Sequence, residues 1–413
     1  MVNSPLEFLA QKYENVVKYD ADGNPSIFVK FPKMKSSDLD ASLPGHTHPA
    51  FIVNGIEQDY ILLGRYKAGE NGVLNGALIS CPNIMPARSL GTDAMLSRMK
   101  AAGQDISGMT IADYGFIKLL AQKHGWAPNG NTAWGQSHID ATPWVAGETA
   151  TAGETWAFEG WEYSCLVTHT TAAETKPDIA PAYWAKGDFI GAVSLDTERD
   201  ATHQTGYRVL NGTGPMDWYL GGDEGSMVDL IGSSMETQFG YRVVDGEIQI
   251  LPDNNAADPE ADLAADSAAW KAILPNLNND GYSFVAPGTA RTLHWNWDSV
   301  NEKIMLDYET TSLEIGVKTD LFTNITIQNT HLPYVPHIVK ELGLIPTGAG
   351  DKTPGRISIN FIVGERIPRR GGKYNSGSAT GLGAMDVTEL RSKADPGYGC
   401  RPRALAGTLI PGD

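Results

Sequence analysis

Two histidines separated by one residue, in the stretch His46-Thr47-His48, have a spacing that could bind a metal ion. Alternate residues of an extended segment point to the same side, so the two imidazoles would share one face. Around a threefold axis, such pairs from three subunits could surround an ion octahedrally. Because His48 also begins the stretch HPAFIVNGIE, a turn that leads into a strand is the favoured interpretation. We expect no metal here and keep the intersubunit ion as the alternative.

A second group of candidate ligands is the acidic stretch DNNAADPEAD at 253–262. Its carboxylate and amide side chains offer the oxygen ligands that Ca²⁺ prefers. They are Asp253, Asn254, Asn255, Asp258, Glu260 and Asp262. The stretch lacks the ordered spacing and the glycine of a known calcium loop. We therefore expect a solvated acidic loop and no cofactor, with Ca²⁺ as the less favoured alternative.

The remaining reactive side chains do not form a catalytic pattern. Cys81, Cys165 and Cys400 are far apart and include no Cys-x-x-Cys spacing, which favours buried thiols over a disulfide framework or a zinc site. Five further histidines show no metal-ligand spacing and are expected to be structural or on the surface. They are His124, His138, His169, His203 and His294. We predict no catalytic residue.

Composition excludes several classes of partner. The chain has 413 residues and a formal net charge of -17, which argues against nucleic-acid binding because such proteins need clustered Lys and Arg. No stretch approaches the roughly 20 apolar residues that span a bilayer, and the first residues lack a signal-peptide pattern. We expect a protein made in the cytoplasm without membrane insertion. The tryptophans between Trp134 and Trp161 could stack on a sugar, but most are predicted to anchor the core.

Two helices have readable boundaries. TDAMLSRMKAAG is predicted to begin at a Thr92 cap and to stop at Gly103. MTIADYGFIKLLAQKHGW places Thr110 and Asp113 at capping-box spacing and ends at Gly125. The apolar stripes of both helices should face the core.

Strands and loops are expected to make up most of the rest of the chain. Strands are predicted within 26–34, 49–68, 303–310 and 357–368, together with a strand pair at 240–251 that turns at Asp245-Gly246. A short helix is predicted at 267–274, and periodicity fades between 127 and 225. The expectation is an α+β fold, with a lead at 1–24 followed by one loop-rich domain at 25–413 that has long insertions, short strands and two main helices.

The segment from Arg369 to Leu405 combines many glycines with few core side chains. It reads RRGGKYNSGSATGLGAMDVTELRSKADPGYGCRPRAL. Glycine permits positive φ and close backbone approach, and arginine can bind several carbonyls or carboxylates at once. The polar residues between them are freed from packing and lack the alternation of a strand. We therefore favour a binding surface over a segment that only closes the fold.

The order of these residues resembles the C-type lectin fold in the version shared by formylglycine-generating enzymes and the variable proteins of diversity-generating retroelements. The matching residues are Arg370, Gly371, Gly372, Tyr374, Gly381, Arg391, Ser392, Gly399 and Arg401. Five stretches upstream are similar to phage and prophage proteins of this fold. They are HPAFIVNGIE at 48–57, MTIADYGFIKLL at 109–120, PNGNTAWG at 128–135, GTGPMDW at 212–218 and YRVVDGEIQILPDNNAA at 241–257.

The resemblance implies a ligand-binding segment at about 366–405. By this resemblance the scaffold consists of Arg370, Gly371, Gly372, Gly381, Arg391 and Arg401. The solvent-facing ligand residues would be Lys373, Tyr374, Asn375, Ser376, Ala379, Lys393, Asp395 and Tyr398. Whether the segment is diversified is a property of the genome and not of this sequence.

The implied function is that of a receptor-binding or tail-tip protein in a virion. It would bind a host-surface protein or glycan, contact other virion proteins through its N-terminal lead, and form a homo-oligomer, for which a trimer is one candidate. A structural virion protein without receptor binding is the alternative. An oxidoreductase similar to formylglycine-generating enzymes is less favoured, because that chemistry needs a reactive cysteine pair and Cys400 has no neighbouring cysteine.

Overall fold

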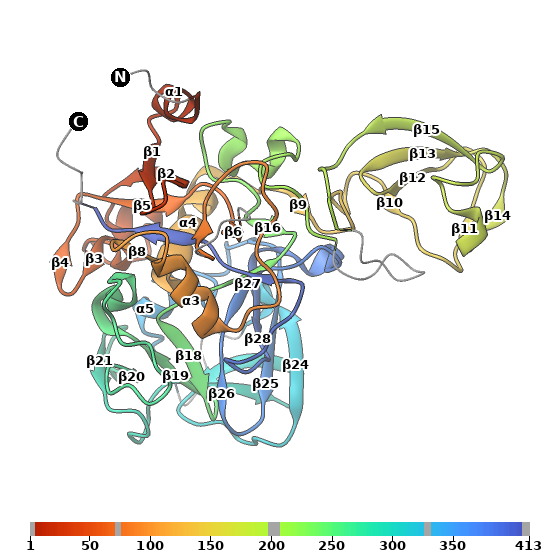
Figure 1. Ribbon diagram of the computed structural model, residues 1–413. Helices are drawn as coiled ribbons and strands as arrows, with labels where there is room; N and C mark the ends of the chain where they lie inside the picture. The colour runs from red at the N-terminus through yellow and green to blue at the C-terminus, as the bar shows by residue number, and fades with distance from the viewer. Residues whose placement is uncertain (1–4, 71–75, 197–206, 326–331, 407–413) are drawn as a thin grey trace.

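The computed structural model describes residues 5–70, 76–196, 207–325 and 332–406 (Figure 1). This part of the chain has few helices and many short strands, which confirms the expected mixture of α and β structure. Three larger sheets and their helices form a main body, and one lobe projects from it.

The first sheet joins both ends of the described chain. Its order is β1 (Val16–Tyr19), β2 (Pro25–Pro32), β5 (Tyr60–Gly64), β30 (Pro402–Ala404) and β8 (Ile106–Gly108), with antiparallel neighbours. The strand β30, near the C-terminus, therefore lies between two strands from the first part of the chain. The pairing of β1 with β2 also places residues on both sides of position 24 in one sheet.

The helix α4 (Ile111–His124) crosses the largest hydrophobic core. The predicted capping box is present, since Thr110 and Asp113 exchange side-chain to backbone hydrogen bonds, and Gly125 ends the helix at φ 68°. The helix α3 (Thr92–Lys100) begins one residue after its cap, Gly91, and buries Met95 and Met99. Both predicted helices are confirmed, but the cap predicted at Thr92 is wrong, since Gly91 is the cap and Thr92 is the first helical residue, and α3 ends before Gly103.

The second sheet runs in the order β21 (Tyr282–Val285), β20 (Lys271–Pro275), β19 (Glu247–Ile250), β18 (Tyr241–Val244) and β26 (Glu365–Arg366), and β22 (His294–Asp298) and β23 (Lys303–Asp307) extend it from β19. The predicted turn between β18 and β19 is confirmed, with positive φ at Asp245 and Gly246. The helix predicted at 267–274 is wrong. Lys271–Pro275 forms β20 instead, because pairing with two neighbouring strands buries Ala272 and Ile273.

The third sheet carries most of the C-terminal segment. Its order is β24 (Gly316–Leu321), β25 (Arg356–Phe361), β28 (Gly381–Val387), β27 (Arg369–Gly371), β17 (Met235–Thr237) and β29 (Tyr398–Gly399). Ile357 and Ile359 of β25 enter the main core, so the residues that alternate with them lie on the other face of the sheet.

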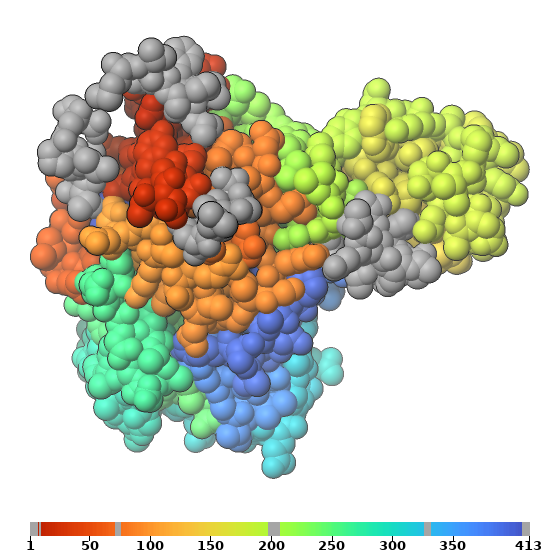
Figure 2. Space-filling view, viewed as in Figure 1, coloured from red at the N-terminus to blue at the C-terminus, as the bar shows by residue number. Residues whose placement is uncertain are grey.

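The projecting lobe comes from the stretch in which periodicity fades (Figures 1 and 2). Short strands organise it: β10 (Thr142–Pro143), β12 (Thr155–Phe158), β13 (Trp161–Cys165) and β15 (Trp184–Phe189) form one sheet, and β11 (Thr149–Ala150) pairs with β14 (His169–Thr170). Its own core contains Trp144, Trp156 and Trp184. Trp144 and Trp156 belong to the span whose tryptophans were predicted to anchor the core, whereas Trp184 lies outside that span.

The remaining short elements connect these parts. The helices are α1 (Pro5–Lys12), α2 (Ser36–Leu39) and α5 (His337–Glu341), and the 3-10 turns are η1 (Pro49–Phe51), η2 (Ala173–Thr175), η3 (Met216–Trp218), η4 (Leu220–Gly222), η5 (Pro252–Ala257), η6 (Phe322–Asn324) and η7 (Gly377–Ala379). The strands are β3 (Ile52–Val53), β4 (Ile56–Glu57), β6 (Gly69–Glu70), β7 (Leu78–Ile79), β9 (Gly130–Asn131) and β16 (Ile231–Gly232). Within the described ranges, every helix is too short or too polar to cross a bilayer.

Candidate functional site

The guanidinium of Arg401 anchors the C-terminal segment in the centre of the molecule. It donates to both carboxylate oxygens of Glu236, with a shortest distance of 2.7 Å, and also to backbone carbonyls at Gly64, Arg65 and Val228. Lys67 donates to the same carboxylate at 2.9 Å. Burial alone would raise the pKa of Glu236, but the charges of Arg401 and Lys67 outweigh it and hold that pKa below its ordinary value.

Arg369 and Arg370 extend to opposite faces of β27. Arg370 is fully buried in the core, where it lies over the Tyr114 ring at 4.6 Å and donates to the carbonyl of Leu382 at 2.9 Å. Arg369 lies over the Tyr398 ring at 4.0 Å. Its Nε is buried and has no hydrogen-bond partner among the described residues. The strand is therefore held by cations on both faces.

Arg391 fastens the last loop of the segment. It donates to both carboxylate oxygens of Glu365 at 2.9 Å and to Asp93 of α3 at 2.8 Å. Burial alone would raise the pKa of Glu365, but hydrogen bonds from Arg391 and Arg242 hold it below its ordinary value. These contacts tie the loop after β28 to the second sheet and to α3.

Glycine is required at both ends of the first loop of the segment. Gly371 has φ 86°, and a β-carbon there would lie 2.4 Å from the carbonyl oxygen of Leu230. Gly381 has φ 133°, and a β-carbon there would lie 2.3 Å from the carbonyl oxygen of Pro354. Gly372 also has positive φ. The loop between them is thus set by backbone conformations and contacts that only glycine permits.

A pocket of about 260 Å³ opens beside this loop. Gly372, Ser376 and Ala379 line one side of it. The opposite side is the outer face of the third sheet, where the pairing brings Thr319, Ser358, Asp386 and Arg369 into one row across four strands. All four line the pocket, and Arg356 joins them. The lining thus offers two guanidinium groups, a carboxylate and hydroxyls to a ligand.

The structure brings only part of the predicted ligand residues to the surface. Asn375 and Lys393 are exposed, and Lys373, Ser376, Ala379 and Asp395 are half-buried. Lys373 and Asp395 lie close together, with 3.8 Å between Nζ and Oδ1. Two adjacent surface loops, 373–380 and 391–396, therefore carry the accessible polar residues.

The expected solvent exposure of Tyr374 and Tyr398 is wrong, since each is only 4% exposed. Tyr374 packs in a cluster with Tyr207 and Trp218, at the base of the projecting lobe. The ring of Tyr398 is covered by Arg369. Each tyrosine finds an apolar or cationic partner from a distant part of the chain, so both act as anchors beneath the loops.

The alternative metal site built from His46 and His48 is also wrong, because His48 is not available as a ligand. His48 is fully buried, and burial lowers its pKa to about 4. Both of its ring nitrogens are engaged: Nδ1 accepts from the backbone NH of Ala50 at 3.2 Å, and Nε2 contacts the carbonyl of Glu341 at 3.1 Å. His48 therefore has no nitrogen left for an ion between subunits.

The acidic loop does not gather its carboxylates. The side chain of Asn255 accepts a hydrogen bond from the backbone NH of Asn54, and the carboxylate of Asp258 accepts one from the side-chain amide of Asn54. Among the residues that the structure describes, one group of three His, Cys, Asp or Glu side chains has its ligand atoms within 4.8 Å of one another, and that group lies elsewhere. The loop instead contacts the turn between β3 and β4.

The three cysteines belong to three different clusters. Cys400 is buried beside α3, Cys165 lies in the core of the projecting lobe, and Cys81 packs against the first sheet. Burial raises the pKa of Cys400 above its ordinary value and that of Cys81 to about 11. All three are free thiols, and burial disfavours the reactive thiolate at Cys81 and Cys400.

Comparison of the chain with models of known protein families and with curated protein sequences finds no match.

Proposed function

We propose that this protein is a noncatalytic receptor-binding protein of a phage or related particle, built on a C-type lectin fold. It would recognise a host-surface protein or glycan through loops 373–380 and 391–396 and the pocket beside them. The ordered motifs of the sequence support the fold assignment, and the mixed architecture with many short strands agrees with it.

One observation supports the functional proposal most strongly: in the C-terminal segment, buried arginines and required glycines form a fixed frame, and polar residues lie on the surface between them. Arg370 and Arg401 are completely buried, and Gly371 and Gly381 are required by their close contacts. Asn375, Ser376, Lys393 and Asp395, which this frame holds, are exposed or half-buried, and Ser376 lines the pocket. Loops positioned by a rigid scaffold are where binding residues concentrate.

Recognition at this surface would be polar. Asn375, Ser376, Lys393 and Asp395 supply hydrogen-bond donors, acceptors and both signs of charge, and the pocket adds the guanidinium of Arg369. A preordered loop lowers the entropy cost of binding, although a small polar contact area gives modest affinity at each site. Display of several copies on one particle would multiply that affinity. This reasoning supports a homo-oligomer attached to other virion proteins through residues 1–24.

Cell binding tests the proposal. We expect the labelled wild-type protein to bind a subset of a panel of bacterial strains. Ala379→Trp should lower binding to those strains at least tenfold, because the indole would occupy the 260 Å³ pocket. Asn278→Trp is the control, since Asn278 is an exposed residue of the β20–β21 loop in another sheet.

If Ala379→Trp and Asn278→Trp bound the strains equally, with unchanged circular dichroism, the pocket would have no part in host recognition. Failure of the wild type to bind any strain that its particle infects would instead favour a structural virion protein.

A further inference from the structure

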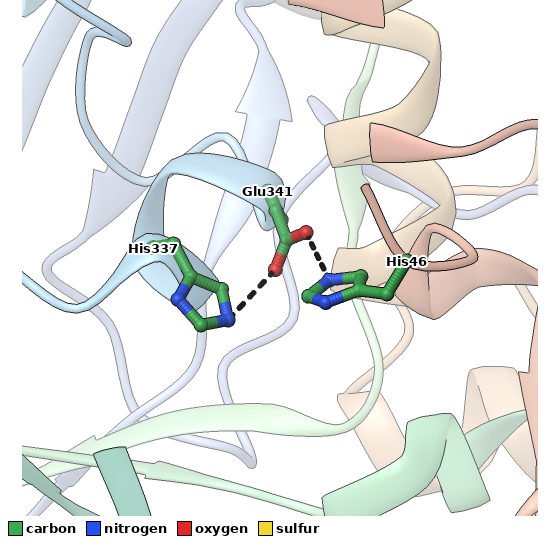
Figure 3. A group of neighbouring side chains, drawn as sticks. All are labelled: His46, His337 and Glu341. Atoms are coloured by element: carbon green, nitrogen blue, oxygen red, sulfur yellow. Dashed lines mark hydrogen bonds and ion pairs between the residues drawn. The ribbon is translucent and has the colours of Figure 1, made fainter. Parts of the chain in front are cut away.

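Three side chains from two distant segments converge on the far side of the main core from the projecting lobe (Figures 1 and 3). His337 and Glu341 occupy positions i and i+4 of α5 and therefore lie on one face of that helix. His46, from the segment between α2 and η1, reaches the same carboxylate with 2.6 Å between its Nε2 and Oε1 of Glu341. In Figure 3 the two imidazoles flank the carboxylate.

Glu341 has an unusual environment for a carboxylate. Its side chain is fully buried. Oε1 accepts a hydrogen bond from the hydroxyl of Ser36 and lies 2.6 Å from Nε2 of His46, where a metal ion would have to replace the imidazole proton, whereas Oε2 has no hydrogen-bond partner in the described structure. A buried carboxylate oxygen without a donor is costly. Such an oxygen calls for a positive group that the described side chains do not supply at hydrogen-bond distance.

The neighbouring atom of His337 is an acceptor as well. Its Nδ1 lies 2.9 Å from the backbone carbonyl of Asp280 and must donate to it, so the neutral ring carries its lone pair on Nε2. That Nε2 is 3.9 Å from the unpartnered Oε2 of Glu341. Two lone pairs that face each other across this distance repel unless a proton or a metal cation lies between them.

We propose that His46, His337 and Glu341 form a binding site for a divalent transition-metal ion of the Zn²⁺ type. Their ligand atoms lie within 4.8 Å of one another. Two imidazoles and one carboxylate are the three protein ligands of open zinc sites, in which a fourth position takes water or another molecule. Imidazole also selects transition metals over Ca²⁺ and Mg²⁺, which prefer oxygen ligands.

The surroundings supply the supporting contacts that metal sites use. A metal-binding histidine usually donates its second ring NH to a carbonyl, as His337 does to Asp280. Ser36 binds the carboxylate of Glu341, and His48 contacts its backbone carbonyl. The position of the carboxylate is thus fixed from both sides.

The site lies at the edge of a second cavity, with a volume of about 240 Å³, which His46 lines together with Ile338 of α5 and Leu342, the residue that follows this helix. Tyr282 and Phe284 add aromatic walls. A small ligand with one metal-binding oxygen or nitrogen and an apolar body would fit this combination. The site is separate from the pocket of the proposed receptor surface. The metal-site proposal therefore does not depend on the proposed receptor-binding function.

Calorimetric titration of the tag-free chain with Zn²⁺, after chelator treatment and dialysis, tests the proposal. We expect one equivalent to bind with micromolar or tighter affinity. His46→Ala should weaken this binding at least tenfold, and His337→Ala should do the same. His124→Ala is the matched control, because His124 is an exposed histidine that stacks on Trp126 away from the site. It should bind Zn²⁺ as the wild type does.

A melting curve shows whether each variant is folded. His46 is substantially exposed, at 45% of its side chain, so His46→Ala should keep its fold in the absence of metal. Zn²⁺ should raise the melting temperature of the wild type and of His124→Ala but not that of His46→Ala. The proposal would be overturned if the wild type did not bind Zn²⁺ with micromolar affinity. It would also be overturned if His46→Ala bound one equivalent of Zn²⁺ as tightly as the wild type does.

Discussion

Glu236 shows how one residue can hold several segments together. Its carboxylate forms ion pairs with Arg401 and Lys67, and all three side chains are fully buried. Because each cation also binds backbone carbonyls, the three charges leave few unsatisfied donors. A buried group of this kind is costly to break, since removal of one charge leaves the others without compensation.

We therefore expect Glu236→Gln to lower the free energy of unfolding by about 3–5 kcal/mol, as measured by chemical denaturation. Glu57→Gln, which removes an exposed carboxylate that contacts Lys33, should leave stability nearly unchanged. An equally small effect at both positions would show that the buried charges do not hold the C-terminal segment.

For single residues, the sequence predicted which side chains anchor the backbone better than it predicted which side chains are buried. Arginines and glycines in a segment with few apolar residues predict an anchored backbone, and Arg370, Arg401 and Gly371 have such contacts. Burial of Tyr374 and Tyr398 could not be predicted, because their partners are distant in sequence. The i, i+4 spacing of His337 and Glu341 was visible in the sequence, but its meaning depends on His46, which only the fold brings near.

Among the elements, β26 shows how a charged pair links two sheets. Glu365 lies on β26 of the second sheet and binds Arg391 in the loop after β28 of the third. Its folded-state pKa is lower than its ordinary value of 4.5, so the carboxylate stabilises the fold above that pH. This contribution is lost as the pH falls through the lower folded-state pKa.

Glu365→Gln should accordingly destabilise the protein by about 2 kcal/mol at pH 7. The difference from wild type should shrink as the pH falls below about 4.5, where the wild-type carboxylate begins to be protonated in the unfolded chain. Thermal melts of both proteins between pH 3.5 and about 7 measure this. A difference that stays constant over the range would exclude the charge as its cause.

Elements with local signals were predictable, and those that depend on partners were not. The capping box and Gly125 define α4 from sequence alone. In contrast, β20 is a strand because two neighbours pair with it, which overrides the helical appearance of the alanine-rich stretch SAAWKAIL at 267–274. The strand predicted within 357–368 is confirmed in part as β25, but that its polar residues Arg356 and Ser358 line a pocket depends on the neighbouring strands and loop.

The whole molecule consists of a main body and a lobe with a separate core. The lobe begins and ends at neighbouring points, because the backbone NH of Ala192 donates to the carbonyl of Gly135 at 2.8 Å. Its tryptophans pack against one another rather than against the main core. No local pattern in the sequence predicted this separation, since the strands of the lobe are very short.

Replacement of residues 139–189 by a short Gly-Ser linker should therefore leave the main body folded, with a melting temperature lowered by only a few degrees. The shortened protein should also bind the same strains as the wild type, because the proposed ligand surface lies outside the lobe. Loss of binding by a folded shortened protein would move recognition to the tryptophan-rich lobe.

Site-specific photo-crosslinking on intact cells tests the receptor surface most directly. A photoreactive amino acid would replace Asn375 in one protein and Asn278 in another; both positions are exposed. The account predicts that cells which bind both proteins yield a crosslinked host molecule from position 375 and none from position 278. Crosslinking from position 278 alone, or equally from both, would contradict recognition through the C-terminal loops.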